Sequence, residues 1–539
     1  MFLIPFVSFI VYYPFEPQPT VFQSPAIAII LLVSLIVATL KKHLNQDLSI
    51  ENLPYLAMPI ILFASINRNL EHSTSNAIMC FSMFVATLII FSQKENYGKW
   101  LPRSMVVCAN IHFLLQIFGM ITHNGKMAIS TVFPLANEIA FFYMVTIFSS
   151  IFIYFKDPST FWKKYSAIIA MEIFISIIVG ESIHTKKLEI GSEHALGIWL
   201  GFVCGTLFTI ALLLWKKFNL PKKLMLSLSA LIFLAIMSSP IIVVNSSIST
   251  ISRGEVSTRI DNWQAGLNIV KDKPFGIGFG SYGANVMQRW PALKDTHFRI
   301  GSTIFSDAHN QYLQILAEIG WLGWLYYCAL FAIPWFVSIF RYLKTGELRF
   351  LCIAGTLAAM LSTMIVAEAI SIFAFIQIIH WMFLIYCVKA LLPLRNKDVR
   401  VKIPLLNNLL LIILIPLLSF LLYDRGKQVY STYLTKDYPL SKALEIYPKN
   451  TAALGFAWNY HLNQRNYQRA LKTIDTIEKI AGYSWPVCQA RAQTYYLMED
   501  LEKACEAAKY PLNHYTDEWT LDLKELLKCE SRYGPKMRE

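Results

Sequence analysis

Arginines, a histidine, acids and clustered glycines occur together in one long polar segment, residues 245–320, which separates two strongly apolar regions. Before residue 424 no other long segment combines these residue types. Guanidinium groups bind anionic oxygens through charge-assisted hydrogen bonds, and an imidazole exchanges protons near neutral pH. The segment is therefore the first candidate for a site that handles an anionic substrate.

The first element predicted in this segment is an amphipathic helix that contains Arg259. Trp263, Leu267 and Val270 lie three or four positions apart, and Arg259 shares their face. Pro274 cannot continue a helix, so we expect the helix to end before it.

Four glycines follow the proline. Gly276, Gly278, Gly280 and Gly283 allow positive φ angles and a close approach by a ligand, and Gly278 and Gly280 are candidate substrate-binding residues. Alternating glycines alone are weak evidence for phosphate binding, and no P-loop lysine follows them.

His309 and Asn310 stand where the chain becomes apolar again, on a face continued by Leu313 and Leu316. A single histidine at such a boundary is more often structural than catalytic. Its combination with the arginines of the same segment makes it a candidate functional residue, and Asn310 is a candidate substrate-binding residue.

The composition is that of a polytopic membrane protein: 55% of residues are hydrophobic, 15% are charged and the mean hydropathy is +0.45. Apolar runs suited to about 30 Å of hydrocarbon predict about thirteen transmembrane helices. They lie at residues 1–13, 24–40, 54–67, 76–92, 104–122, 132–155, 165–183, 194–215, 224–244, 311–340, 349–369, 371–390 and 403–423.

The loop charges predict the orientation, because Lys and Arg accumulate in cytoplasmic loops. With the N-terminus inside, the predicted inside loops hold twenty of them and the short outside loops only Arg68, Lys126, Lys186 and Lys187. We therefore expect a bacterial inner-membrane protein whose polar segment and C-terminal segment lie in the periplasm.

The net charge of +13 follows mainly from these inside loops. The aromatic and basic interleaving of a nucleic-acid binder is missing, so no nucleic-acid partner is expected. The sequence has no C-x-x-C or H-E-x-x-H spacing, and we expect neither a metal nor a cofactor. Cys488, Cys505 and Cys529 in the polar tail could form one disulfide in an oxidising compartment and leave one thiol.

Residues 424–539 repeat with an offset of 34, since residues 466–471 match residues 500–505. This is the period of tetratricopeptide (TPR) repeats, in which paired helices stack and form a groove. We expect five residues to pack between these helices: Leu454, Ala457, Tyr460, Ala470 and Leu471. The groove could bind a protein, or the tail could be a stabilising lid.

The predicted fold is thus an all-α polytopic membrane protein with a large periplasmic loop and a C-terminal TPR-like helical domain. Its predicted parts are transmembrane helices at 1–244, a catalytic loop at 245–310, further transmembrane helices at 311–423 and the periplasmic tail at 424–539.

The loop motifs R-x3-W, P-x-G-x-G-x-G, H-N-x-x-L and E-x-G-x-x-G occur in the order typical of one known superfamily. In this respect the chain resembles the O-antigen ligase and polymerase superfamily, and within it the pilin-type O-oligosaccharyltransferases. Further stretches that resemble this branch are residues 13–25, Asn137 to Ala140, and Glu368 near the start of a late helix.

The resemblance implies transfer of a preassembled oligosaccharide from a polyprenyl diphosphate to a hydroxyl, without a nucleotide sugar. Arg259 is then the candidate ligand of the leaving diphosphate, and His309 the candidate base. Binding of phosphate by His309 is an alternative that the sequence leaves open. Glu368 is a further candidate substrate-binding residue.

The chain departs from the family pattern at Glu193, where an arginine after serine is usual. A diphosphate clamp would have to combine Arg259 with Lys186, Lys187, Arg289 or Arg299, or the donor is oriented differently.

Three functions fit these observations. The first is glycosylation of Ser or Thr in a pilin-like protein, and the second is ligation or polymerisation with lipid A core or another glycan as acceptor. The third is a transporter or flippase, which is disfavoured because few ionisable residues lie at mid-helix depth.

Overall fold

The computed structural model describes sixteen stretches of the chain. These are residues 20–40, 47–49, 52–70, 73–92, 102–111, 114, 146–154, 157–187, 196–245, 255–289, 307–365, 374–391, 400–402, 406–437, 440–482 and 484–514.

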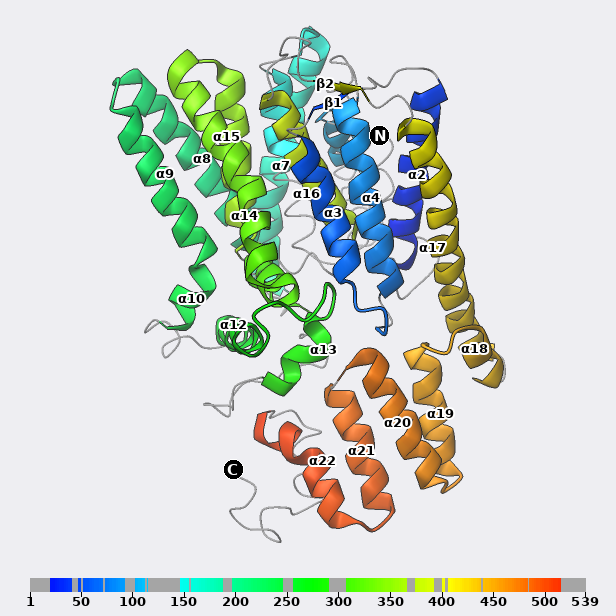
Figure 1. The fold of residues 1–539 in the computed structure, drawn as a ribbon. Coiled ribbons are helices and arrows are strands. Elements are labelled where there is room, and N and C mark those ends of the chain that lie inside the picture. Colours follow the sequence, from blue (N-terminus) through cyan, green and yellow to red (C-terminus); the bar gives the residue numbers. More distant parts are fainter. Residues whose placement is uncertain are drawn as a thin grey trace.

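The described helices form a bundle with a smaller helical unit beyond one end (Figure 1). Helices of the bundle are α2 (Thr20–Leu40), α3 (Leu53–Ser65), α4 (Ser73–Ser92), α7 (Thr160–Lys187), α8 (Leu196–Lys217), α9 (Lys222–Met237), α10 (Ser239–Val244), α14 (Gln311–Thr345), α15 (Leu348–Thr363), α16 (Ala374–Leu391) and α17 (Leu406–Asp437). Below the bundle lie α12 (Glu255–Asp272), α13 (Tyr282–Val286) and the 3₁₀ turn η6 (Met287–Arg289). The smaller unit contains α18 (Leu440–Ile446), α19 (Thr451–Asn463), α20 (Tyr467–Ala481), α21 (Trp485–Leu497) and α22 (Leu501–His514).

The predicted helical architecture is confirmed, with one addition. Strands β1 (Asp47–Ser49) and β2 (Arg400–Lys402) form a short antiparallel pair. The run predicted at 224–244 is divided at Ser238 into α9 and α10, because Pro240 lacks the amide hydrogen that a continuous helix needs. Helix α17 passes through residue 424 without a break, so the predicted domain boundary lies inside a helix.

Within the described stretches, three helices are long and apolar enough to cross a membrane: α4, the part of α8 from Leu200 to Lys217, and α14. The other spans among the thirteen expected from the sequence stay predictions. Small residues let two of the bundle helices approach closely, since a Cβ on Gly205 of α8 would stand 2.7 Å from the Cβ of Ala359 in α15.

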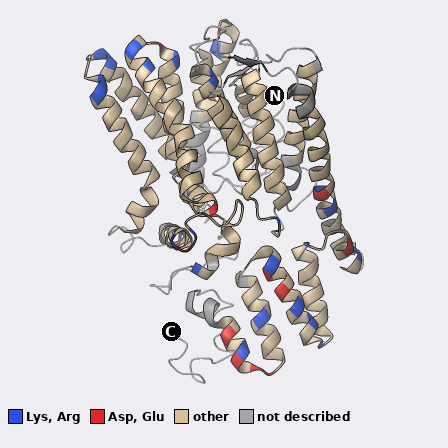
Figure 2. Cartoon of the chain, viewed as in Figure 1, with Lys and Arg blue, Asp and Glu red and all other residues tan. Residues whose placement is uncertain are grey.

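Lysines and arginines gather at the ends of α8, α9 and α15 that lie farthest from the C-terminal unit (Figure 2). They include Lys216 and Lys217 at the end of α8, Lys222 at the start of α9 and Arg349 at the start of α15. This distribution agrees with the predicted inside loops at 216–223 and 341–349.

Helix α14 contains a break at Gly320, whose φ of 71° and ψ of −176° are not helical. The amide of Trp321 donates to the carbonyl of Pro274 at 3.1 Å instead of to a carbonyl of its own helix. In return, the amides of Ile277 and Gly278 donate to the carbonyls of Ala317 and Glu318 at 3.1 and 2.9 Å. The loop after α12 therefore takes up the hydrogen bonds that the break in α14 releases.

The C-terminal unit repeats with the predicted period. Helix α21 begins and ends 34 residues after α19, and α22 begins 34 residues after α20. The turns also repeat, because Arg465 and Glu499 both have positive φ, and Asn466 and Asp500 accept hydrogen bonds from the amides three residues later. Two helix pairs of 34 residues are thus present in the tail.

Packing in this unit follows the expected pattern with one exception. Leu454 and Ala470 are buried, whereas the expectation for Tyr460 was wrong, since it is 57% exposed. Tyr460 lies on the face of α19 that no described helix covers. Cys505 is bonded in a disulfide, and Cys488 is buried.

We predict that Gly320→Ala strongly destabilises the chain. A Cβ at this position would stand 2.4 Å from the carbonyl carbon of Phe275, and the backbone angles are accessible only to glycine. We expect a loss of at least about 3 kcal/mol in the free energy of unfolding.

Gly346→Ala is the matched control. Gly346 also has positive φ, at 74°, but its Cβ would contact only the end of Lys216, so the cost should be about 1 kcal/mol. Thermal unfolding in detergent measures both variants, and equal midpoints for the two would contradict the role of the break.

Candidate functional site

The candidate site centres on the four residues that precede α14. His309 has a φ of 47°, a left-handed conformation that is uncommon for residues other than glycine. The side chain of Asp307 supports this turn, because its Oδ1 accepts a hydrogen bond from the His309 amide at 3.0 Å. The same Oδ1 lies 3.6 Å from Nδ1 of the His309 imidazole. One carboxylate therefore contacts both the backbone and the ring of His309.

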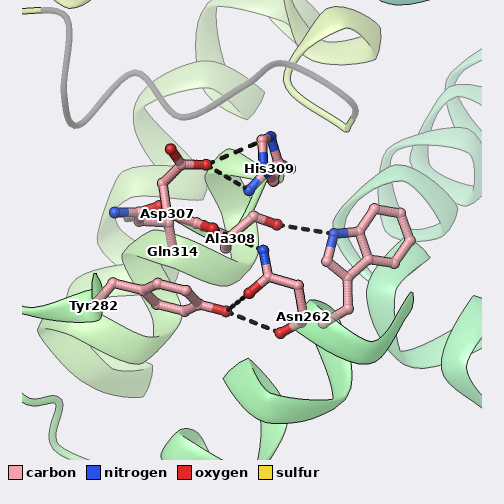
Figure 3. Close-up of polar contacts among 7 residues, drawn as sticks. Asn262, Tyr282, Asp307, Ala308, His309 and Gln314 are labelled. Atoms are coloured by element: carbon pink, nitrogen blue, oxygen red, sulfur yellow. Dashed lines mark hydrogen bonds and ion pairs between the residues drawn. The ribbon is translucent and has the colours of Figure 1, made fainter. Parts of the chain in front are cut away.

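Helix α12 holds this turn from the other side (Figure 3). Asn262 Nδ2 donates to the carbonyl of Asp307 at 2.7 Å, and Trp263 Nε1 donates to the carbonyl of Ala308 at 2.9 Å. Asn262 and Trp263 are both buried, so these bonds are shielded from water. The amphipathic helix predicted around Trp263 is confirmed, and its buried face holds the histidine turn.

A second set of contacts comes from the first turns of α14. The amide of Ala308 donates to Gln314 Oε1 at 2.9 Å, and Gln314 Nε2 donates to Glu318 Oε1 at 3.1 Å. The same Glu318 oxygen accepts a hydrogen bond from the amide of Tyr282 at 3.1 Å. Because the Gln314 Nε2 group donates to Glu318, the Gln314 side-chain oxygen faces the Ala308 amide and accepts its hydrogen bond. Glu318 is almost fully buried.

Tyr282 closes the network between α12 and α13. Its hydroxyl lies 2.9 Å from the backbone oxygen and 3.0 Å from the side-chain oxygen of Asn262. Burial, with Asp307 and Glu318 nearby, raises the pKa of Tyr282 well above its ordinary value. The phenol therefore stays a neutral hydrogen-bond donor.

Asn310 has a structural position. Its side chain caps α14 by accepting from the amide of Leu313 at 3.0 Å and donates to the carbonyl of Ile365 at 2.9 Å. It is completely buried. These contacts account for an asparagine at this position, and its predicted substrate contact stays a prediction.

Of the predicted loop arginines, the structure describes Arg259 and Arg289, which lie near opposite ends of α12. Arg259 stands three and four residues before Asn262 and Trp263, which puts it on the face that holds the histidine turn. Arg289, in η6, donates from Nε to Asp272 at 2.8 Å. Asp272 stands thirteen residues after Arg259 and thus about 20 Å along the helix. Arg259 thus shares the helix face that holds the His309 turn, whereas Arg289 is paired at the other end of α12.

The glycines have structural partners as well. Gly276, Gly278 and Gly280 have the expected positive φ, whereas Gly283 lies inside α13 and the expectation for it was wrong. A Cβ on Gly280 would stand 1.9 Å from Asn76 Nδ2 of α4. Close packing thus explains this glycine, and substrate binding by Gly278 and Gly280 stays a prediction.

The structure does not describe the side chains of the other predicted site residues. Arg299, Glu368 and Glu193 lie outside the described residues, and Lys186 and Lys187 end α7 with side chains that are not described. Among the residues that the structure describes, no group of three His, Cys, Asp or Glu is placed to hold a metal ion.

Comparison with protein families identifies the segment that contains this turn. Residues 193–328 match the O-antigen ligase family, and this range runs from before α8 into α14, with Arg259 and His309 inside it. Residues 193–328 are thus similar to an O-antigen ligase domain. The resemblance to the superfamily is thus confirmed, and glycan transfer of the O-antigen ligase class is supported. A search of curated proteins found no match.

Sequence reasoning missed four residues of this ligase domain: Asp307, Asn262, Gln314 and Glu318. Asn310, Gln314 and Glu318 are spaced four apart in a segment whose other residues, except Gln311, are apolar, so one buried polar stripe was readable from the sequence. Asp307 stands two residues before His309, the spacing of a side-chain turn. Asn262 carries no comparable signal.

We predict that Gln314→Ala loosens the histidine turn of the ligase domain. The buried amide of Ala308 loses its acceptor, which costs about 1–3 kcal/mol and should speed amide hydrogen exchange in residues 307–310 at least about fivefold. Gln264→Ala is the control, because Gln264 donates to Asn268 on its own helix α12. Unchanged exchange in Gln314→Ala, measured by mass spectrometry, would refute the bridging role.

Proposed function

We propose that the chain is an oligosaccharyltransferase that moves a preassembled glycan from a polyprenyl diphosphate to a Ser or Thr hydroxyl of a pilin-like protein. The observation that carries the proposal is the buried support of one histidine turn: Asp307 contacts the His309 ring, and α12, which carries Arg259, binds the same turn. The O-antigen ligase domain supports the donor class, because its family acts on lipid-linked oligosaccharides.

The proposed step is a single displacement. His309 accepts the proton of the acceptor hydroxyl while its oxygen attacks the anomeric carbon of the glycan. The bond from that carbon to the diphosphate oxygen breaks, and polyprenyl diphosphate leaves with the bonding electrons. Because Nδ1 of His309 faces Asp307, we assign proton acceptance to Nε2, and the carboxylate stabilises the imidazolium that forms.

Arg259 is the proposed ligand of the leaving diphosphate. A guanidinium forms paired hydrogen bonds to phosphate oxygens and keeps its charge at any physiological pH. Arg289 already forms an ion pair with Asp272, so we leave it out of this role. Lys186, Lys187 and Arg299 stay candidates for a second cation, and Glu368 for a sugar contact.

The tail supports a protein acceptor. A Cβ on Gly482, between α20 and α21, would stand 2.4 Å from the Cβ of Ala284 in α13, so the repeat unit lies against the element that follows the glycine loop. A TPR-like unit at this position could present a protein chain to the site. The second candidate is transfer to lipid A core or another glycan, which the same ligase domain favours.

We further propose an inner-membrane location with the site and the tail in the periplasm. The gathering of Lys and Arg at the opposite ends of α8, α9 and α15 supports this orientation. The disulfide at Cys505 supports an oxidising compartment.

His309→Ala and Arg259→Ala should each lower glycan transfer by about a hundredfold or more, with normal membrane insertion and yield. Lys271→Ala is the control, because Lys271 is an exposed cation on the same helix. Intact-mass analysis of a pilin-like acceptor made with each variant gives the readout. In a separate test, the purified unmodified enzyme should keep its activity in excess chelator. A folded His309 or Arg259 variant that transfers at the wild-type rate would remove that residue from the mechanism.

Deleting the repeat unit from Leu440 onward tests the acceptor class. If the tail receives a protein, glycosylation of the whole acceptor should fall at least tenfold, while transfer to a short acceptor peptide should survive. Equal loss of both activities with poor yield would indicate a stabilising lid. Full activity on the whole acceptor would favour the glycan-ligase alternative.

A further inference from the structure

Phe275 is the most exposed large apolar side chain among the described residues, at 84%. Its backbone is nevertheless firmly held. The neighbouring Pro274 carbonyl accepts from Trp321, the Gly276 amide donates to the Lys273 carbonyl, and Gly320 packs directly on the Phe275 backbone. The fold therefore projects this phenyl ring outward at a fixed point beside the break in α14.

The exposed ring continues an apolar surface of α14. Leu322, two residues after the break, is 73% exposed, and Leu325 is more than half exposed. Helical spacing puts Leu322 and Leu325 on the same side as the exposed Ile333 and Phe340 further along α14. Since α14 is long and apolar enough to cross a membrane, this exposed apolar side is suited to contact lipid, and Phe275 stands at its end.

The surface changes character within two residues of the ring. Lys271, Asp272 and Lys273 are exposed and charged, whereas Phe275 is exposed and apolar. Trp321, exposed by 43% beside them, has the side chain that proteins favour at the membrane–water boundary. Lysines just outside an apolar ring also suit the phosphates of lipid headgroups.

We propose that Phe275, together with Trp321 and Leu322, is an interfacial anchor that inserts into the outer edge of the bilayer and is covered by phospholipid. The anchor holds the loop between α12 and α13 at the height of the membrane surface. Since this loop is hydrogen-bonded to α14 at Ala317 and Glu318, the anchor also fixes the height of the His309 turn. The inference concerns the lipid contact alone and does not depend on the proposed transfer reaction.

Nitroxide labels in proteoliposomes of phosphatidylethanolamine and phosphatidylglycerol test the anchor. Phe275→Cys is compared with Lys273→Cys, an exposed charged position two residues earlier, and with Leu322→Cys as the lipid reference; the unmodified chain corrects for native cysteines. Molecular oxygen concentrates in lipid and a nickel chelate in water. We expect oxygen to relax the label at 275 as strongly as the label at 322. We expect nickel to relax the label at 273 at least threefold more strongly than the label at 275.

Three outcomes would overturn the anchor. A label at 275 that responds to nickel like the label at 273 would place the ring in water. A label at 275 shielded from both reagents would mean that protein covers it. A label at 322 in lipid with 275 in water would confine the lipid contact to α14. Since the Phe275 side chain is exposed, its replacement removes little packing, and thermal unfolding of the variant verifies that the fold is kept.

Discussion

The exchange of backbone hydrogen bonds at Gly320 is the interaction on which the site depends. Near a membrane, an unpaired amide or carbonyl is costly, so a helix can break only where another segment satisfies the released groups. The loop after α12 does this, because Ile277 and Gly278 donate to α14 while the Pro274 carbonyl accepts from Trp321. The break thereby joins α14 to the loop that connects α12 with α13.

This joint explains how a strained histidine is kept in place. The first turns of α14, up to Glu318, are separated by the break from the long apolar part and instead form polar contacts with Tyr282 and Ala308. Asn262 and Trp263 of α12 complete the support. A left-handed conformation at His309 costs free energy, and these buried bonds offset that cost. Such pre-organisation is typical of residues that act on a substrate.

The sequence predicted features that follow from local periodicity or from glycine and proline chemistry. The helix around Trp263, the positive φ at Gly276, and the 34-residue repeat all belong to this class. It did not predict the break in α14, because residues 311–340 read as one apolar run and the partners of the break are 40 to 47 residues away along the chain. It missed the role of Asp307, since the contact depends on a turn that α12 stabilises from a distance. The burial of Tyr460 was predicted wrongly because a helical pattern shows an apolar face without showing which neighbour covers it.

A cryo-electron microscopy structure with a non-transferable phosphonate analogue of a polyprenyl-diphosphate glycan would test the central claim most directly. The account predicts that the diphosphate lies within hydrogen-bond distance of Arg259 and that the anomeric carbon stands beside the His309 ring, with Asp307 on its other side. A diphosphate bound away from α12, or a His309 ring turned from the anomeric carbon, would contradict the account.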